Sequence, residues 1–136
     1  MDNIVIEGYH GTHYIPKVDF NANTGICLLE GESYLEDTTN FYKPLFEWFK
    51  EFLTTTLKDL VFNIKLEYYN TSSSKCLVDI LELLGEYQNK GRNIIVNWFY
   101  DSDSEDFEEE IEEVEDFMIE TGLKINLIPY SKKNNI

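Results

Sequence analysis

The chain has 136 residues, of which 43% are hydrophobic and 15% aromatic, so it can bury one globular core and is not largely disordered. Its 26 acidic and 11 basic residues give a formal net charge of -15. Such a chain repels phosphate backbones and anionic headgroups, which argues against nucleic acid and membrane partners. It also has no run of about 18 apolar residues that could span a bilayer. We expect a single domain over residues 1–136.

The N-terminal segment and the cysteines indicate a cytoplasmic protein. Residues 1–6 lack the basic, apolar and small-residue pattern of a signal peptide. Cys27 and Cys76 lie far apart within apolar patterns, which is typical of buried, reduced thiols.

The first third of the chain predicts short strands and one hairpin. Apolar residues alternate at 4–6, and those between 15 and 20 suggest a second strand. Turn-forming residues fill 21–25, where Gly25 can adopt a positive φ. A strand over 26–31 then completes a hairpin.

An amphipathic helix is predicted next. Pro44 is tolerated only in a first turn, so we expect the helix to begin near Asn40 and to end at Thr54–Thr56. Its apolar face comprises Phe41, Leu45, Trp48, Phe49, Phe52 and Leu53.

The rest of the chain is organised around a strand, a turn and a helix. The strand runs from Leu60 to Tyr69 and alternates with period two. Its apolar face comprises Leu60, Phe62, Ile64, Leu66 and Tyr68, and its polar face comprises Asn63, Lys65 and Glu67. The turn is Asn70–Lys75, with four consecutive hydroxyl residues, and the helix is predicted over Cys76–Gln88.

The C-terminal third repeats the alternation of strand and helix. Gly91 ends the preceding helix, and a strand is predicted over 93–100. A third helix follows the loop at 101–105, with apolar residues Phe107, Ile111, Val114, Phe117 and Met118. The last strand is expected over 124–128, and residues 130–136 are expected to form a flexible tail.

These elements predict an α/β fold. Alternating strands and helices call for a parallel sheet, and the polar face of the central strand leaves one side of that sheet to water. Since crossovers are right-handed, each strand adds in the same direction. We expect a β–α superhelix with a mixed sheet of about five strands, an N-terminal hairpin, and three helices mainly on one face.

The hydroxyl turn, Thr71 to Ser74, lies at the carboxyl end of the central strand, where such sheets bind ligands and partners. Its residues alone leave several interpretations open. Ser and Thr commonly cap helices, but one or two would suffice. A phosphate-binding loop for a nucleotide or flavin would require glycines that the turn lacks, and a catalytic hydroxyl would require a nearby base. From the residues alone, an ordinary capped helix start and a switch modified by a kinase therefore both stay open.

Two other segments suggest metals only weakly. His10 and His13 lack further spaced ligands. Asp101–Glu112 has the acidic spacing of a calcium loop, but Asp106 occupies the position that requires glycine, so we interpret these acids as a solvated helix face. We predict no cofactor.

Three stretches, Gly31–Tyr34, Tyr69–Lys75 and Gly91–Asp101, resemble the SiaC family of bacterial regulatory phosphoproteins. A Ser/Thr turn between a strand and a helix is also similar to STAS domains, typified by anti-sigma-factor antagonists. The similarity covers roughly Ile4 to Ile128, and Asn70–Ser73 is its most specific part.

The resemblance implies a non-enzymatic switch protein. A cognate serine/threonine kinase would phosphorylate the motif threonine, Thr71, and a PP2C-type phosphatase would remove the phosphate. The unphosphorylated form would bind and activate a diguanylate cyclase, raising cyclic di-GMP and favouring biofilm. We expect the docking face to comprise Tyr69, Asn70, Thr71, Ser72, Ser73 and Lys75, although Ser72 and Ser73 could instead cap the helix.

Overall fold

A computed structural model describes residues 1–11 and 14–132. The main sheet has the order β1-β4-β5-β6-β7-β8. Its strands are β1 (Ile4–Ile6), β4 (Lys17–Phe20), β5 (Ile26–Ser33), β6 (Leu60–Tyr69), β7 (Ile94–Asp101) and β8 (Ile125–Tyr130). A separate small sheet pairs β2 (Tyr9–His10) with β3 (Tyr14–Ile15), and the helices are α1 (Thr38–Thr55), α2 (Thr71–Asn89) and α3 (Phe107–Thr121).

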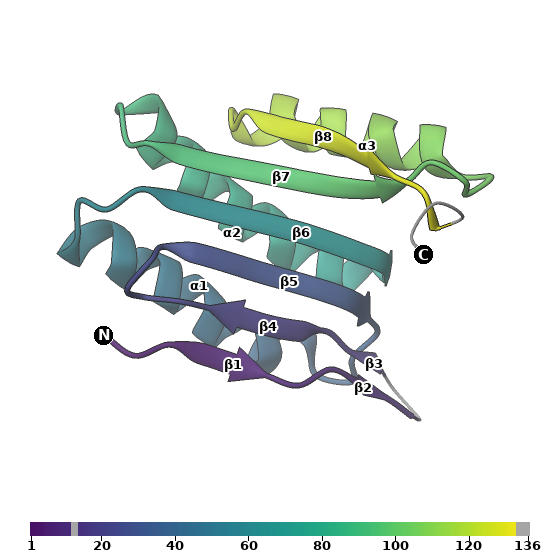
Figure 1. The fold of residues 1–136 in the computed structure, drawn as a ribbon, viewed down its shortest axis with the longest axis horizontal. Helices are drawn as coiled ribbons and strands as arrows, with labels where there is room; N and C mark the ends of the chain where they lie inside the picture. The colour runs from purple at the N-terminus through teal and green to yellow at the C-terminus, as the bar shows by residue number, and fades with distance from the viewer. Residues whose placement is uncertain (12–13, 133–136) are drawn as a thin grey trace.

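The three helices cover one face of the main sheet, as the sequence predicts (Figure 1). Strands β5, β6, β7 and β8 pair in parallel with one another, and the antiparallel pairs β4–β5 and β1–β4 extend the sheet beyond β5. The sheet has six strands rather than about five because β1 pairs with β4. The hairpin around residues 21–25 is present as predicted, with Gly25 at φ 74°.

The central strand β6 alternates as predicted up to Leu66, with four buried side chains facing the helices. The pairing with β5 then shifts register: Gly31 pairs with Leu66, but Glu32 pairs with Tyr68. An extra residue in one strand reverses which face the following side chains occupy. Tyr69 therefore packs against the core, whereas Tyr68, predicted on the apolar face, is 49% exposed.

An aromatic cluster holds the helices on the sheet. The Phe20 ring lies with its centroid 4.9 Å from that of Phe49 and 5.8 Å from that of Phe62. Trp48 stacks on Phe52 within α1, and their centroids are 5.3 Å apart. Since each buried aromatic contributes a large apolar area, this core fixes α1 against β4 and β6.

The starts of α1 and α2 differ from those expected from the sequence. Helix α1 begins at Thr38, where the Asp37 side chain accepts a hydrogen bond from the Asn40 N–H at 3.3 Å. Pro44 is therefore inside the helix rather than in its first turn, at an exposed position where water can hydrate the carbonyl that loses its donor. Helix α2 begins at Thr71 rather than at Cys76.

Two further boundaries are corrected. Ile15 belongs to β3, so the strand predicted from residue 15 to 20 is divided in two. Tyr130 is the last residue of β8 rather than part of a tail, and the Lys65 ammonium lies 4.4 Å from the centroid of its ring. Residues 133–136 lie outside the described residues. In the described part of the chain, no helix is long and apolar enough to cross a membrane.

Candidate phosphorylation and docking site

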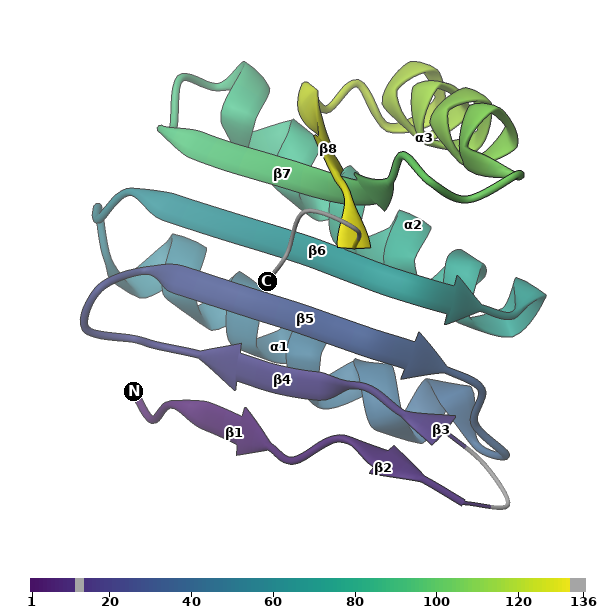
Figure 2. The same cartoon turned by 45° about the vertical axis from the view of Figure 1, so that its right-hand side comes forward.

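The Asn70–Lys75 segment lies at the carboxyl edge of the parallel strands. Asn70 directly follows β6, and its N–H donates to the Ser33 carbonyl at the end of β5 at 3.1 Å. In Figure 2, the connections from β6 to α2 and from β7 to α3 lie on the same side of the molecule. This edge therefore brings together the starts of two helices.

Asn70 is the N-cap of α2. Its Oδ1 accepts hydrogen bonds from the Ser73 N–H at 3.0 Å, from the Ser73 hydroxyl at 2.6 Å and from the Ser72 hydroxyl at 3.2 Å. Because the Asn70 side chain accepts from a free N–H group of the first turn, Asn70 is the cap, and neither Ser72 nor Ser73 is. The motif asparagine fixes the backbone that presents the next residue.

Ser73 belongs to a buried hydroxyl network rather than to an exposed face. Its hydroxyl lies 2.8 Å from that of Ser33, which in turn lies 2.7 Å from the hydroxyl of Tyr42. Ser73 and Ser33 are both 0% exposed. The prediction that Ser73 frames a docking face is therefore wrong, because α2 turns this side chain towards β5 and α1.

Ser33 and Tyr42 were missed by the sequence analysis as site residues. Burial raises the pKa of Tyr42 to about 12, so its hydroxyl stays protonated and can donate at any physiological pH. A second hydrogen bond joins the starts of α1 and α2, since the Ser72 and Thr38 hydroxyls lie 2.9 Å apart. The only available sequence signal was the position of Ser33 in the Gly31–Tyr34 stretch.

Thr71 is the first residue of α2, and its side chain is exposed. Among the described residues, its hydroxyl has no hydrogen-bond partner. Lys75, one helical turn later, is also exposed. Ser74 also makes no side-chain hydrogen bond there but is half-buried, so among the four consecutive hydroxyls Thr71 is the one that is both exposed and unbonded in the described part of the chain.

A groove of about 460 Å³ opens beside Thr71, and the wall opposite Thr71 is acidic. Its wall on α3 is formed by Glu109, Glu110 and Glu113. Trp98 Nε1 donates to Glu110 Oε2 at 2.7 Å. Burial raises the pKa of Glu110 despite this bond. Burial also raises the pKa of Tyr69, and the Glu113 carboxylate raises it further.

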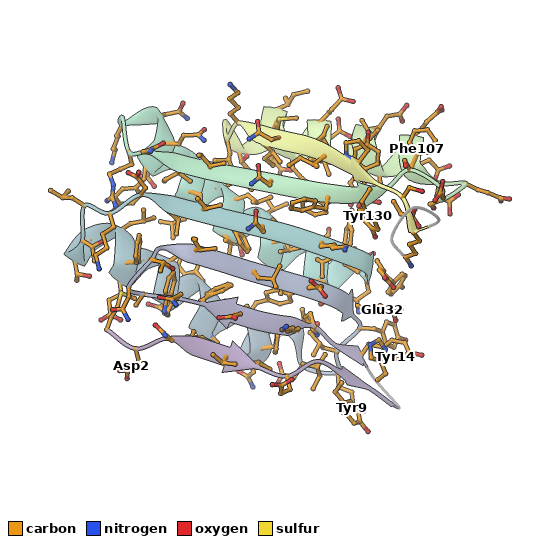
Figure 3. All side chains as sticks on the ribbon, viewed as in Figure 1. Asp2, Tyr9, Tyr14, Glu32, Phe107 and Tyr130 are labelled. Atoms are coloured by element: carbon orange, nitrogen blue, oxygen red, sulfur yellow. The ribbon has the colours of Figure 1, made fainter. Side chains whose placement is uncertain are left out.

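Exposed tyrosines lie near this site, and one of them, Tyr68, lines the same groove as Thr71. The rings of Tyr34 and Tyr68 lie 6.2 Å apart between centroids, and both side chains are 49% exposed. Tyr14 exchanges two backbone hydrogen bonds with Tyr34, at 2.9 and 3.0 Å. Figure 3 shows Tyr14 and Glu32 together at this edge. Exposed tyrosines are enriched at protein interfaces, so this edge has the composition of a docking surface.

The described part of the chain does not group other metal-binding side chains around His10. His10 lies on the β2–β3 hairpin, where its ring contacts Tyr14 with centroids 5.2 Å apart. His13, its proposed partner in a metal site, lies outside the described residues. Over residues 1–11 and 14–132, no three His, Cys, Asp or Glu side chains are grouped to hold a metal ion. Helix α3 begins at Phe107, as its apolar spacing predicts.

Comparison with known proteins agrees with this arrangement. Residues 9–130 match the family model described as SiaC family regulatory phosphoprotein. The chain belongs to the SiaC family. An uncharacterised protein of Pseudomonas aeruginosa strain UCBPP-PA14 is 33% identical over 103 residues, which cover 76% of this chain and 82% of that protein.

Two solved SiaC structures from Pseudomonas aeruginosa have the same fold. SiaC in complex with the diguanylate cyclase SiaD, of which it is the activator, has a TM-score of 0.79 and 27% identity, covering 92% of this chain and all of that chain. SiaC without a partner has a TM-score of 0.78 and 27% identity, covering 94% of this chain and 99% of that chain. The chain is thus similar to a regulatory protein that acts through a complex.

Proposed function

We propose that this protein is a non-enzymatic switch that binds a diguanylate cyclase and is controlled by phosphorylation of Thr71. The observation that carries the proposal is that the motif hydroxyls differ in hydrogen bonding and exposure. Ser72 and Ser73 are engaged in bonds that join α1, α2 and β5, whereas Thr71 is exposed and unbonded. A kinase could modify Thr71 without unfolding the helix start.

A phosphate on Thr71 would be compatible with the folded domain. Phosphorylation adds a charge of about -1.5 to -2, and the first turn of a helix favours negative charge because its N–H groups and dipole point outwards. Lys75 lies four residues later, the spacing at which opposite charges attract on a helix. The modification would therefore change the surface rather than the fold.

The same phosphate would oppose docking. A partner covering Thr71 would have to remove water from a doubly charged group, and an unpaired buried charge costs several kcal/mol. Since about 1.4 kcal/mol changes a dissociation constant tenfold, this cost is enough to release a micromolar complex. We infer that Tyr69, Asn70, Thr71, Ser72 and Lys75 form the regulated contact.

The regulators implied by this function are a cognate serine/threonine kinase and a PP2C-type phosphatase. A small-molecule function for the same edge is disfavoured, since the groove beside Thr71 is lined by carboxylates that would repel a nucleotide phosphate.

The test uses the purified chain, its cognate kinase and ATP. Mass spectrometry should find an added mass of about 80 Da, one phosphate, on the peptide containing Thr71, and Thr71→Ala should remain unmodified. The cyclase of the same genome that is most similar to SiaD should then bind the unmodified chain and not the phosphorylated one. Equal binding of both forms would refute the switch.

A further inference from the structure

A second groove, separate from the one beside Thr71, lies between α1 and α2 on the side of the helix layer that faces away from the sheet. It has a volume of about 430 Å³. Its lining residues are Thr39, Tyr42, Lys43, Phe46, Cys76, Asp79, Glu82, Leu83 and Glu86. Apart from Tyr42, none of these residues belongs to the Asn70–Lys75 segment's hydroxyl network or lines the groove beside Thr71.

The groove has an apolar floor and an acidic rim. Phe46 and Leu83 are partly buried hydrophobic residues that pack against the core and leave part of their surface in the groove. The rim on α2 carries three carboxylates, from Asp79, Glu82 and Glu86, whereas the lining contains one basic residue, Lys43. An apolar stripe beside one row of negative charge is complementary to an amphipathic helix with basic residues along one side.

Thr71 lines the other groove, but its position on α2 lies close to the rim of this one. At about 100° per residue, Ser72 lies on the same helical face as Cys76, Asp79 and Leu83. Thr71 lies at the edge of that face, in line with Glu82 on the rim. A segment seated in the groove would therefore reach the start of α2, where Thr71 is exposed.

We infer that the α1–α2 groove binds a basic amphipathic helix of the partner, with its apolar side against Phe46 and Leu83 and its Lys or Arg side chains against the rim of α2. This inference rests on the proposed function, since it names the segment of the cyclase that the switch controls. A phosphate on Thr71 would then stand at the amino-terminal mouth of the groove, where the bound helix would have to desolvate it.

A second copy of this chain is a poorer occupant. With a net charge of -15, two copies repel each other. The third helix, which offers an amphipathic pattern, carries Glu108, Glu109 and Glu110 in its first turn and no basic residue in its last. Placing it on the rim would bring like charges together, which costs affinity.

Cys76 makes the groove directly observable. It is half-buried and lines the groove, whereas Cys27 is 0% exposed and serves as an internal control. Alkylation with a maleimide, followed by mass spectrometry, reports how quickly Cys76 reacts. Saturating amounts of the cyclase should slow its modification at least about tenfold, because docking excludes reagent and water from the contact. An unchanged rate in a complex that demonstrably forms would overturn the inference.

Charge-reversal variants test the rim separately. The double variant Asp79→Lys and Glu82→Lys should weaken cyclase binding about tenfold, because two attractive contacts become repulsive. The matched control is Glu108→Lys and Glu112→Lys, which changes the charge equally at exposed positions of α3 outside both grooves. It should bind within about twofold of the unmodified chain, since distant charges are screened. Equal weakening by both double variants would overturn the inference.

The two proposals fail in different ways. If the cyclase binds, phosphorylation of Thr71 releases it, and yet Cys76 and the rim variants behave like the unmodified chain, the groove assignment is wrong and the switch stands. If the cyclase does not bind, or binds the phosphorylated chain equally well, the switch itself is wrong. A circular dichroism spectrum of each variant confirms that the fold is retained.

Discussion

The starts of α2 and α3 occupy equivalent places in the fold and differ in charge. Each helix follows a parallel strand and begins at the same edge of the sheet (Figure 2). Helix α3 carries three glutamates in its first turn, and the side chain of its N-cap residue, Asp106, makes no capping bond. Helix α2 has no acidic residue in its first turn and is capped by Asn70 through its side chain.

This difference shows where a regulated charge can act. The positive end of the α3 dipole already faces permanent carboxylates, so another negative group there would change little. The α2 start is neutral and held by hydrogen bonds rather than by charge, so a phosphate there would produce a large local change. The predictions below test this contrast, from the largest expected effect to the smallest.

The largest effect is expected for Thr71→Glu, which places a permanent negative charge at the α2 start. We expect cyclase affinity to fall at least about tenfold, the consequence of about 1.4 kcal/mol of desolvation, while the melting temperature stays nearly unchanged. Isothermal titration calorimetry and a thermal melt measure the two quantities. As a control, Asp106→Glu at the α3 start should leave both unchanged. A loss of fold in Thr71→Glu would contradict the surface mechanism.

Ser73→Ala should have the next largest effect, on stability. It removes the hydrogen bonds that the Ser73 hydroxyl makes with Ser33 and with the Asn70 cap, and each such bond contributes about 0.5–1.5 kcal/mol. The free energy of unfolding from urea titration measures the loss. Ser74→Ala is the matched control, because the Ser74 side chain has no hydrogen-bond partner among the described residues. Similar losses at both positions would argue against the buried network.

Substitution of the two N-cap residues compares how the starts of α2 and α3 are stabilised. Asn70→Ala should lower the free energy of unfolding by about 1 kcal/mol, because it removes the side chain that caps α2. Asp106→Ala should cost only a few tenths of a kcal/mol, since it removes a charge near the α3 dipole but no capping bond. Equal losses would show that the two starts are held in the same way.

The smallest effect concerns the pH dependence of stability. Burial raises the pKa of Glu110 in the folded protein. As pH rises above the ordinary pKa of 4.5, this carboxyl therefore ionises in the unfolded chain before it ionises in the folded one. The carboxyl therefore favours folding when protonated, and its contribution declines as pH rises through the folded pKa. The stability of Glu110→Gln relative to the unmodified chain should increase from pH 4 to pH 7.

Urea titrations across this range provide the measurement for Glu110. Glu108→Gln, an exposed change on the same helix, corrects for the general effect of removing one negative charge from an acidic protein. A constant difference between Glu110→Gln and Glu108→Gln over the whole range would contradict the predicted burial effect.

Much of the fold was predictable because its signals are local. The alternation from Leu60 to Leu66 gave the correct buried face of β6, and the spacing after Phe107 gave the start of α3. The uncovered sheet face was predictable from Asn63 and Lys65. Asn63 hydrogen-bonds Asn97 of β7 at 2.9 Å, across a face that the helices leave open.

The candidate site was predictable only in part. The sequence identified Thr71 as a candidate switch, and the structure finds this side chain exposed. It also grouped Ser73 with Thr71, although a turn of 100° per residue gives neighbouring helix positions different environments. The start of α2 at Thr71 decides which hydroxyl faces the core, and the continuous run of hydroxyls contained no apolar marker for that boundary.

By itself, the sequence determined the order of the strands and helices and the place where the central strand meets its helix, since side-chain periodicity is written into neighbouring residues. Only the tertiary structure decided that Tyr69 rather than Tyr68 packs inwards and that Ser33 meets Ser73 across 40 residues. These outcomes depend on the register between β5 and β6, and register is set by pairing between distant segments, which no local pattern specifies.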